Sequence, residues 1–215
     1  MRRLEEIFAH FPGIGPRQAK RFVYYLLNRP SASIKEFTDL IHEVKTSTAE
    51  CNRCHRFFMS GNREAAGGGR KTVVCPTCAD TSRDSSLLMV VARDSDFESI
   101  ERSGAYKGLY FVLGGTVPVL DKEPDKRIRL KGLLARLAQK DSPIKEVILS
   151  LNTTPDGENT AETVKHALLD ASGADPLSST ETNIKLTVLG RGLSTGAELE
   201  YVDGETIRNA LLNRH

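Results

Sequence analysis

The chain has 215 residues, 39% of them hydrophobic, and a formal net charge of +2 at pH 7, so it can bury a core as one large domain or as two to three small units. No apolar run approaches the ~20 residues that span a membrane, and the first residues, MRRLEEIFAHF, do not form a signal-peptide core. We therefore expect a soluble, cytoplasmic protein with no membrane partner.

The positive charge is concentrated at the amino terminus. Residues 1–30 hold six Lys and Arg residues against two Glu residues, a local net charge of +4, although the whole chain is nearly neutral. A basic segment on a nearly neutral body is the distribution expected of a face that contacts phosphate groups.

Three helices are predicted in the first 45 residues, because apolar side chains recur there at helical spacing. The first two apolar sets are Leu4, Ile7, Phe8, Phe11 and Ala19, Phe22, Val23, Leu26, on either side of a PGIGP break. Ser33 and Glu36 have the spacing of a capping box and predict the start of the third helix. Its apolar face comprises Ile34, Phe37, Leu40, Ile41 and Val44.

The PGIGP break predicts a helix-hairpin-helix that binds DNA. Gly13 and Gly15 allow backbone N–H groups to face an anion at a helix start. Arg17, Lys20 and Arg21 add positive charges around the same phosphate. Such contacts hold the DNA backbone and carry no sequence information. The alternative is that the segment merely turns the chain between two core helices.

The four cysteines of the chain predict a metal centre. Cys51, Cys54, Cys75 and Cys78 form two CxxC pairs separated by twenty residues. Two thiolate pairs on tight turns can meet at one tetrahedral ion, and four sulfur ligands favour one structural Zn²⁺ per chain. A closed four-sulfur shell stabilises a fold and does no chemistry. The alternatives are a redox CxxC pair, unrelated free thiols and, less favoured, an iron–sulfur centre.

Two further features lie within the cysteine segment. His55 follows the second cysteine, and we expect it to face solvent outside the ligand set, because four cysteines already complete the shell. Residues 61–70, GNREAAGGGR, are rich in glycine and predict a flexible loop between the two cysteine pairs.

From residue 87 onward, short apolar runs alternate with helical patterns. The predicted strands are LLMVV at 87–91, YFVLGG at 110–115, EVILSL at 146–151 and IKLTVL at 184–189. Helical spacing is seen at 130–137 and 161–168, and the turn-rich segment 172–183 predicts a loop. Strands separated by helices predict βαβ units around a mostly parallel sheet.

Four features follow one another along the chain, namely FPGIGPRQAKR, the four-cysteine knuckle, GLYFVLGG and GRGLSTGAELEYVD. With these features in this order, nearly the whole chain resembles the RecR family of bacterial recombination mediators. The resemblance implies a multi-domain α/β protein. Its parts are a helix-hairpin-helix DNA-binding region at 1–50, a four-cysteine zinc finger at 51–84, a Toprim domain at 85–183, and a carboxy-terminal strand and helix at 184–215 that complete the body and its subunit contacts.

The same resemblance implies a function and partners. Members of the family are expected to form a homo-oligomer, a dimer or a tetrameric ring, on double-stranded and gapped DNA. They are expected to work with RecO and RecF to load RecA on gapped or single-stranded DNA in recombinational DNA repair. The resemblance explains the 61–70 segment least, since it looks like an insertion in the knuckle.

Catalytic Toprim domains need a Glu after the first strand and a DxDxxG motif after a later one to hold Mg²⁺. Here Ala92, Asn152 and Thr154 occupy the carboxylate positions, and Gly157 is retained. We therefore expect no catalytic residue and no enzymatic activity. The glycine-rich GRGLSTG segment at 190–196 lacks the Lys-Ser or Lys-Thr of a nucleotide-binding loop. The alternative function is a Mg²⁺-dependent nuclease or primase-like enzyme that uses the remaining acids.

Acidic residues remain near these positions. The resemblance favours Asp156 and Glu158 as part of a surface that docks a basic partner such as RecO. Asp96 and Glu101 are explained equally well as helix-face charges with a contact to the helix dipole and as partner contacts. A third hypothesis, a structural subunit without DNA binding, is disfavoured by the basic amino-terminal segment.

Overall fold

The polypeptide divides into two compact units. The computed structural model describes residues 1–60, 73–121, 123–139, 142–171, 184–190, 202 and 204–212. The N-terminal unit comprises Met1–Ala49 and Met59–Lys71, and the sheet unit comprises Glu50–Phe58 and Thr72–His215. All four cysteines therefore belong to the unit that also contains the predicted strands.

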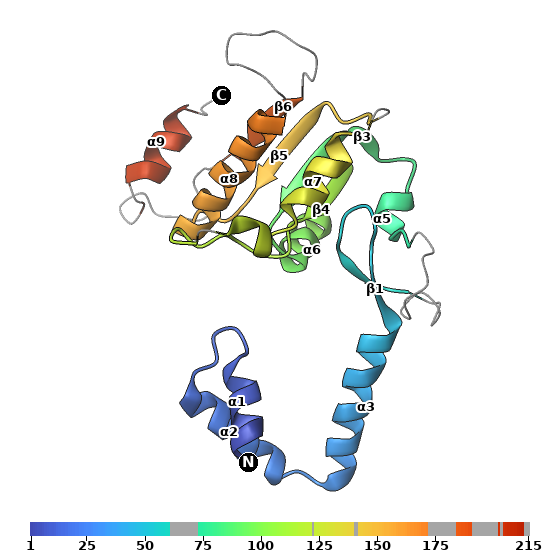
Figure 1. Ribbon diagram of the computed structural model, residues 1–215, viewed down its shortest axis with the longest axis vertical. Coiled ribbons are helices and arrows are strands. Elements are labelled where there is room, and N and C mark those ends of the chain that lie inside the picture. The colour runs from blue at the N-terminus through green and yellow to red at the C-terminus, as the bar shows by residue number, and fades with distance from the viewer. Residues whose placement is uncertain are drawn as a thin grey trace. The chain divides into compact units, whose positions relative to one another are not determined.

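The N-terminal unit begins with a hairpin of two helices, α1 (Arg2–Ala9) and α2 (Pro16–Leu27), followed by α3 (Ser31–Ser47) (Figure 1). The ring of Phe8 meets the rings of Phe11 and Phe22 edge-on, each at a centroid distance of 5.6 Å. Ala19 and Val23 of α2 are buried beside this aromatic cluster. The predicted helices on either side of the PGIGP break are confirmed.

Helix α3 begins earlier than the predicted capping box. Its N-cap is Pro30, whose carbonyl oxygen accepts the N–H groups of Ser33 at 3.0 Å and Ile34 at 3.2 Å, and no side chain caps this helix. Ser33 therefore lies inside the first turn, and the predicted capping box with Glu36 is wrong. Pro30 has the extended ψ of 145° that is usual at an N-cap, and the helical conformation follows directly after it.

Short elements carry the cysteines. Strands β1 (Thr48–Glu50) and β2 (Phe57–Met59) form a two-stranded sheet, and the first CxxC pair lies in the loop between them. The second pair flanks and enters the single-turn helix α5 (Pro76–Ala79).

The sheet unit is built on four parallel strands in the order β4-β3-β5-β6. Their bounds are β3 Asp84–Val91, β4 Gly108–Val112, β5 Glu146–Ser150 and β6 Lys185–Val188, which confirms the four predicted runs. The connections contain α6 (Asp94–Ser103), the 3-10 turn η1 (Pro124–Lys126), α7 (Leu130–Leu137) and α8 (Pro155–Ala171). The predicted α/β fold with a parallel sheet is therefore confirmed.

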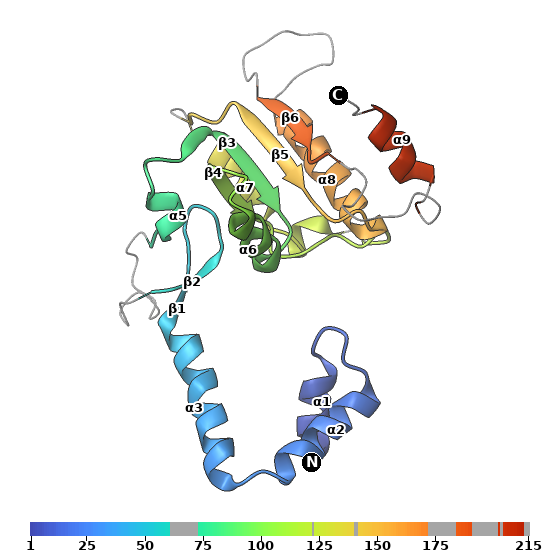
Figure 2. The same cartoon turned by 180° about the vertical axis from the view of Figure 1, so that it is seen from behind.

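Side chains alternate between the two faces of this sheet, as strand geometry requires. Leu88 and Val90 of β3 face the core under α7 and α8, whereas Met89 and Val91 face α6. The views in Figures 1 and 2 show the helices on the corresponding sides. Both faces are covered, which explains why the strands read as continuous apolar runs.

A further helix, α9 (Gly204–Leu212), follows where a short carboxy-terminal helix was expected. The described helices include none that is long and apolar enough to cross a membrane. The predicted loops at 61–70 and 172–183, and most of the GRGLSTG segment, lie outside the described residues.

Candidate functional site

The four cysteine side chains meet at one point of the sheet unit. The Sγ atoms of Cys51, Cys54, Cys75 and Cys78 lie within 4.8 Å of one another, and all four residues are buried. None of the four forms a disulfide. This is the only group of potential metal ligands found among the described residues.

The spacing of these sulfur atoms fits a tetrahedral metal ion. A Zn–S bond of about 2.3 Å corresponds to an S···S edge of about 3.8 Å in a tetrahedron. The Sγ atoms of Cys54 and Cys75 are 3.6 Å apart. The donor set is thus both chemically and geometrically suited to an ion that prefers thiolates.

Backbone groups already support negative charge on one sulfur. The N–H groups of Arg53 and Cys75 donate to Sγ of Cys51 at 3.4 and 3.3 Å. Hydrogen bonds from the neighbouring thiols, that of Cys54 first, hold the pKa of Cys51 well below its usual range. Hydrogen bonds to the neighbouring thiols, that of Cys51 first, raise the pKa of Cys54, and burial acts in the same direction.

The loop that holds the first cysteine pair, residues 51–54 and here called the first knuckle, is hydrogen-bonded to β4 at the edge of the sheet. The carbonyl oxygen of Cys54 accepts the N–H of Val112 in β4 at 2.8 Å. Beside this contact, Nη1 of Arg136 donates to the carbonyl oxygens of Arg53 at 2.7 Å and Tyr110 at 2.8 Å. Arg136 lies in the last turn of α7. Its guanidinium group therefore links this helix to the first cysteine pair and to the edge strand β4.

The charge of Arg136 is balanced by the cysteine cluster. Arg136 forms no ion pair with a carboxylate in the part of the chain that the structure describes. Burial lowers its pKa, and the nearby sulfur atoms of Cys78, Cys54 and Cys51 act in the opposite direction. The cysteine sulfur atoms are therefore the groups near Arg136 that favour its charged form.

We expect Arg136→Met to destabilise the metal-loaded protein by about 1–3 kcal/mol, because two carbonyl oxygens lose their charged donor. Denaturant unfolding measures the change, and the rate of metal loss to a chelator should rise. Arg102→Met is the matched control, because Arg102 is exposed on α6 and its replacement removes the same charge. Equal effects of the two substitutions would contradict the bridging role.

His55 is not the solvent-facing residue that the sequence predicted. Its Nδ1 lies 2.8 Å from Oε1 of Glu50, its ring meets Phe111 edge-on at 5.1 Å, and its side chain is only 27% exposed. The backbone of His55 has φ 61°, the left-handed conformation that closes the knuckle turn. Gly132 of α7 makes room for the ring, since a Cβ there would lie 3.2 Å from His55 Nε2. His55 nevertheless lies outside the ligand cluster, as predicted.

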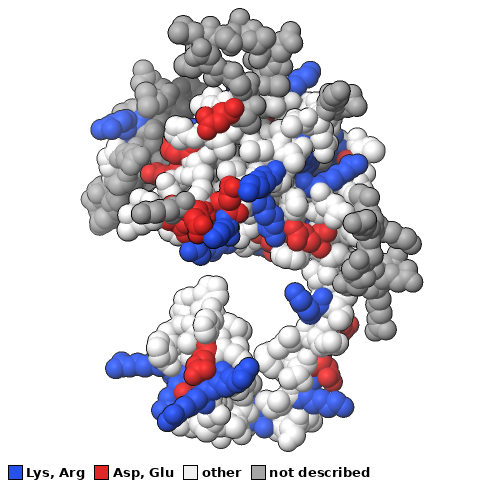
Figure 3. Space-filling model, in the orientation of Figure 1, with Lys and Arg blue, Asp and Glu red and all other residues white. Residues whose placement is uncertain are grey.

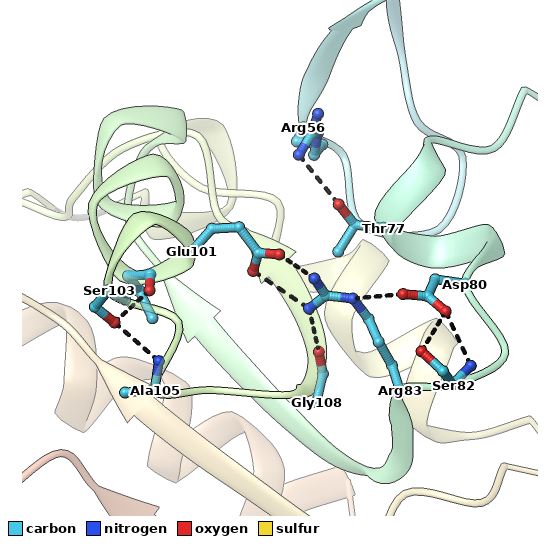
Figure 4. A network of polar contacts seen from close by, with 10 residues as sticks. Arg56, Thr77, Asp80, Ser82, Arg83, Glu101, Ser103, Ala105 and Gly108 are labelled. Carbon is cyan, nitrogen blue, oxygen red and sulfur yellow. Dashed lines mark hydrogen bonds and ion pairs between the residues drawn. The ribbon is translucent and has the colours of Figure 1, made fainter.

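The second cysteine pair, residues 75–78 and here called the second knuckle, is followed by a segment that is bound to α6 and to the start of β4. Figure 4 shows Arg83 between Asp80 and Glu101, with a further bond to the carbonyl oxygen of Gly108. Burial disfavours the ionised form of Glu101, but the hydrogen bonds from Arg83 outweigh it and hold the pKa of Glu101 below its usual range. Glu101 therefore has an internal role. Asp96 also does, because its carboxylate accepts the N–H of Arg93 at the start of α6.

The helix hairpin of the N-terminal unit has the backbone that the glycines predicted. Gly13 has φ 75°, which a residue with a Cβ rarely adopts. Gly15 is the N-cap of α2, and Pro16 follows at the first helical position. No side chain caps α2, so the N–H groups of Arg17 and Gln18 at its start point outward.

The predicted basic residues are exposed on the same helix. Arg17, Lys20 and Arg21 are all exposed, and none forms an ion pair with a described acidic residue. Figure 3 shows Lys and Arg side chains extending from the hairpin on the face in view. Unpaired positive charge beside free N–H groups is suited to binding an anion.

The positions that hold Mg²⁺ in catalytic Toprim domains serve packing in this chain. Ala92, directly after β3, is fully buried. The hydroxyl of Thr154 accepts the N–H of Gly157 at 3.2 Å at the start of α8, as an N-cap does. A Cβ on Gly157 would overlap the carbonyl oxygen of Asn152, so this glycine is required by a close backbone approach.

The two predicted partner-binding acids have different surroundings. The carboxylate of Asp156 accepts the N–H of Val119 at 3.3 Å, and its side chain is half-buried. Glu158 is exposed. Residues two positions apart on a helix do not share a face, so α8 does not present these carboxylates side by side.

Sequence reasoning missed the arginines that support the metal centre. Arg136 lies 83 positions from Arg53, and Arg83 lies 18 positions from Glu101, so no local motif marks these contacts. The one available signal was the position of Arg136 in the largely apolar segment 130–138, whereas Arg83 lies among polar residues.

Comparisons with known proteins agree with these features. Family models match residues 1–45 (RecR, helix-hairpin-helix), 86–176 (Toprim domain) and 192–215 (RecR, C-terminal). "Recombination protein RecR" of Bifidobacterium adolescentis is 38% identical over 100% of this chain and 94% of its own length. The proteins of the same name from Lactobacillus helveticus and Bifidobacterium longum DJO10A are 32% and 34% identical over 98% and 100% of this chain, and over 94% of their own lengths. The chain therefore belongs to the RecR family.

Proposed function

We propose that this chain is a DNA-binding recombination mediator without enzymatic activity, which acts in the cytoplasm in recombinational DNA repair. It helps RecO and RecF to load RecA on gapped or single-stranded DNA. The observation that carries the proposal is the uncapped start of α2, with Gly13 at positive φ and three exposed basic residues behind it. The relatives named as recombination proteins support the biological setting.

The proposed DNA contact is to backbone phosphates through Gly13, Gly15, Arg17, Lys20 and Arg21. Affinity should then fall linearly with the logarithm of the salt concentration, with little dependence on base sequence. Fluorescence anisotropy with gapped and fully paired DNA of several sequences tests this. Salt-independent binding, or strong preference for one sequence, would refute it. A RecA-loading assay with RecO and RecF tests the mediator role.

The metal is proposed to be one structural Zn²⁺ per chain, held by Cys51, Cys54, Cys75 and Cys78. A bound Zn²⁺ neutralises clustered thiolates and cross-links two chain segments. Water would be excluded from the ion, because all four cysteines are buried and Cys54 is hydrogen-bonded to Val112 of β4. The proposed domain order is a helix-hairpin-helix region at 1–50, a zinc finger at 51–84, a Toprim domain at 85–183 and a carboxy-terminal region at 184–215.

The absence of catalysis is proposed from the residues at the carboxyl ends of β3 and β5. Val91 and Ser150 are paired in the sheet, so Ala92 and Asn152 follow at one edge, where Toprim enzymes keep their acids. Incubation of gapped DNA with Mg²⁺ or Mn²⁺ should give no cleavage. Cleavage that is abolished by Asp156→Ala would instead support the nuclease or primase-like alternative.

RecO is proposed to dock on the surface that includes Asp156 and Glu158. Because Asp156 also supports Val119, its charge is better removed with Asp156→Asn than reversed. Capture of RecO should weaken with Glu158→Lys and stay unchanged with Asp170→Lys, which reverses an exposed charge three turns further along α8. Equal capture by both variants would exclude this surface.

The chain is also proposed to form a homo-oligomer, a dimer or a tetrameric ring. Helix α3 buries none of its residues, and Phe37, Leu40, Ile41 and Val44 are each 47–57% exposed along one face. A groove of about 500 Å³ at the start of α3 is lined by apolar residues of all three helices. An apolar helix face of this length is usually covered by another chain. Native mass spectrometry of Leu40→Glu, Ile41→Glu should show monomers if this face joins the subunits.

A further inference from the structure

The exposed face of α2 contains an aromatic side chain that the phosphate contacts do not use. Tyr24 is 47% exposed and follows Lys20 by four residues and Arg21 by three. Residues at these spacings are neighbours on one helix face. The buried residues Ala19 and Val23 lie about 120° around the helix from Tyr24, which leaves part of the Tyr24 side chain outside the hairpin core.

Tyr24 and its neighbour Tyr25 are both partly exposed, at 47% and 56%, but a guanidinium lies close over the ring of Tyr25. The guanidinium of Arg29 lies 4.2 Å from the ring centroid of Tyr25 and also donates to its hydroxyl. Tyr25 further belongs to the apolar groove at the start of α3. Over Tyr24, the nearest cation is the ammonium of Lys20 at 5.9 Å, and no described aromatic ring contacts it.

Charge complementarity identifies the class of ligand. Arg17, Lys20 and Arg21 form an unpaired basic row that ends at Tyr24, roughly 10 Å beyond Arg17 along the helix at the usual rise per residue. Proteins that bind single-stranded nucleic acid combine such a basic track with aromatic rings that stack on bases. Paired bases in a duplex are stacked on one another and cannot reach such a ring.

We propose that Tyr24 stacks on an unpaired base, so that the hairpin distinguishes single-stranded DNA and gaps from continuous duplex. This inference rests on the proposed function, because the basic row must first bind the phosphates. The stacking supplies a preference that phosphate contacts alone do not provide.

The full-length, metal-loaded protein allows a direct spectroscopic test, because the chain contains no tryptophan. Tyr24→Trp and Tyr25→Trp each introduce a single tryptophan, whose emission can be excited apart from that of the remaining tyrosines. Titration with an oligothymidine should quench the emission of Tyr24→Trp strongly and that of Tyr25→Trp only weakly. Equal quenching of the two variants would overturn the assignment of Tyr24.

Binding measurements complete the test with a labelled oligothymidine and a blunt duplex of the same length. Tyr24→Ala should weaken binding of the oligothymidine roughly tenfold, the scale of one lost base–aromatic stack, and leave duplex binding and the salt slope unchanged. Tyr24→Phe should bind like the parent protein. Equal losses for both DNAs, no loss, or a change of subunit number in native mass spectrometry would each overturn the proposal. If the parent protein binds neither DNA, the proposed function itself fails.

Discussion

Replacing Cys75 by Ser should abolish tight metal binding and unfold the two knuckles. Metal analysis of the parent protein should return about one zinc ion per chain, and the variant should return almost none. Structural zinc sites in small peptides have apparent binding free energies of about 10–16 kcal/mol near neutral pH, which is comparable to the whole stability of a domain. Loss of one of four ligands therefore removes most of what holds residues 51–54 and 75–78 together.

The effect of Cys75→Ser should be local to the sheet unit. Hydrogen exchange should accelerate at the amide of Val112, which binds the carbonyl oxygen of Cys54, while amides of α2 in the N-terminal unit should be unaffected. A chelator should reproduce these changes in the parent protein and add nothing in the variant. A parent protein that stays fully folded after its metal has been removed would refute a structural role for the ion.

Reversing the charge of Arg17 and Arg21 together should weaken DNA binding on the order of 100-fold or more at low salt and lower the salt slope by about 2. Both side chains lie at the start of α2 beside its free N–H groups, where the helix dipole already favours a phosphate. Because the contacts are to the backbone, all DNA sequences should be affected alike. Anisotropy titrations over a range of salt concentrations measure both quantities.

Arg2→Glu, Arg3→Glu is the matched control for this prediction. It makes the same change in net charge on α1, at residues that are also exposed. If the contact is specific to the hairpin, the control should lose much less affinity. Equal losses would mean that the general charge of the N-terminal unit attracts DNA and that the start of α2 is not the binding site.

The carbonyl oxygens that Arg136 binds illustrate what local patterns do not encode. Arg53 and Arg136 are 83 positions apart, and only the path of the chain from the knuckle through β3, α6 and β4 to α7 brings them together. His55 was misplaced for the same reason. Counting ligands correctly excluded it from the metal shell, but its ring packs on Phe111 because β4 lies directly behind the knuckle.

The start of α3 shows a different limit. Ser33 and Glu36 have the spacing of a capping box, yet the helix begins at Ser31 because the carbonyl oxygen of Pro30 accepts the first N–H groups. Side-chain spacing identifies residues that are able to cap a helix. Whether they do so depends on where the backbone first becomes helical, which here is directly after Pro30.

The sequence by itself determined the elements whose signals are local or periodic. Apolar runs separated by segments of helical spacing predicted the parallel sheet and the paired helices. Two glycines predicted the turn at Gly13, and two CxxC pairs predicted one cluster of four sulfurs. Only the tertiary structure decided how Arg136 holds the first cysteine pair, how Arg83 is paired with Glu101, and which faces of α2 and α3 are uncovered. The physical reason is that backbone conformation follows from neighbours in sequence, whereas burial and charge pairing follow from neighbours in space.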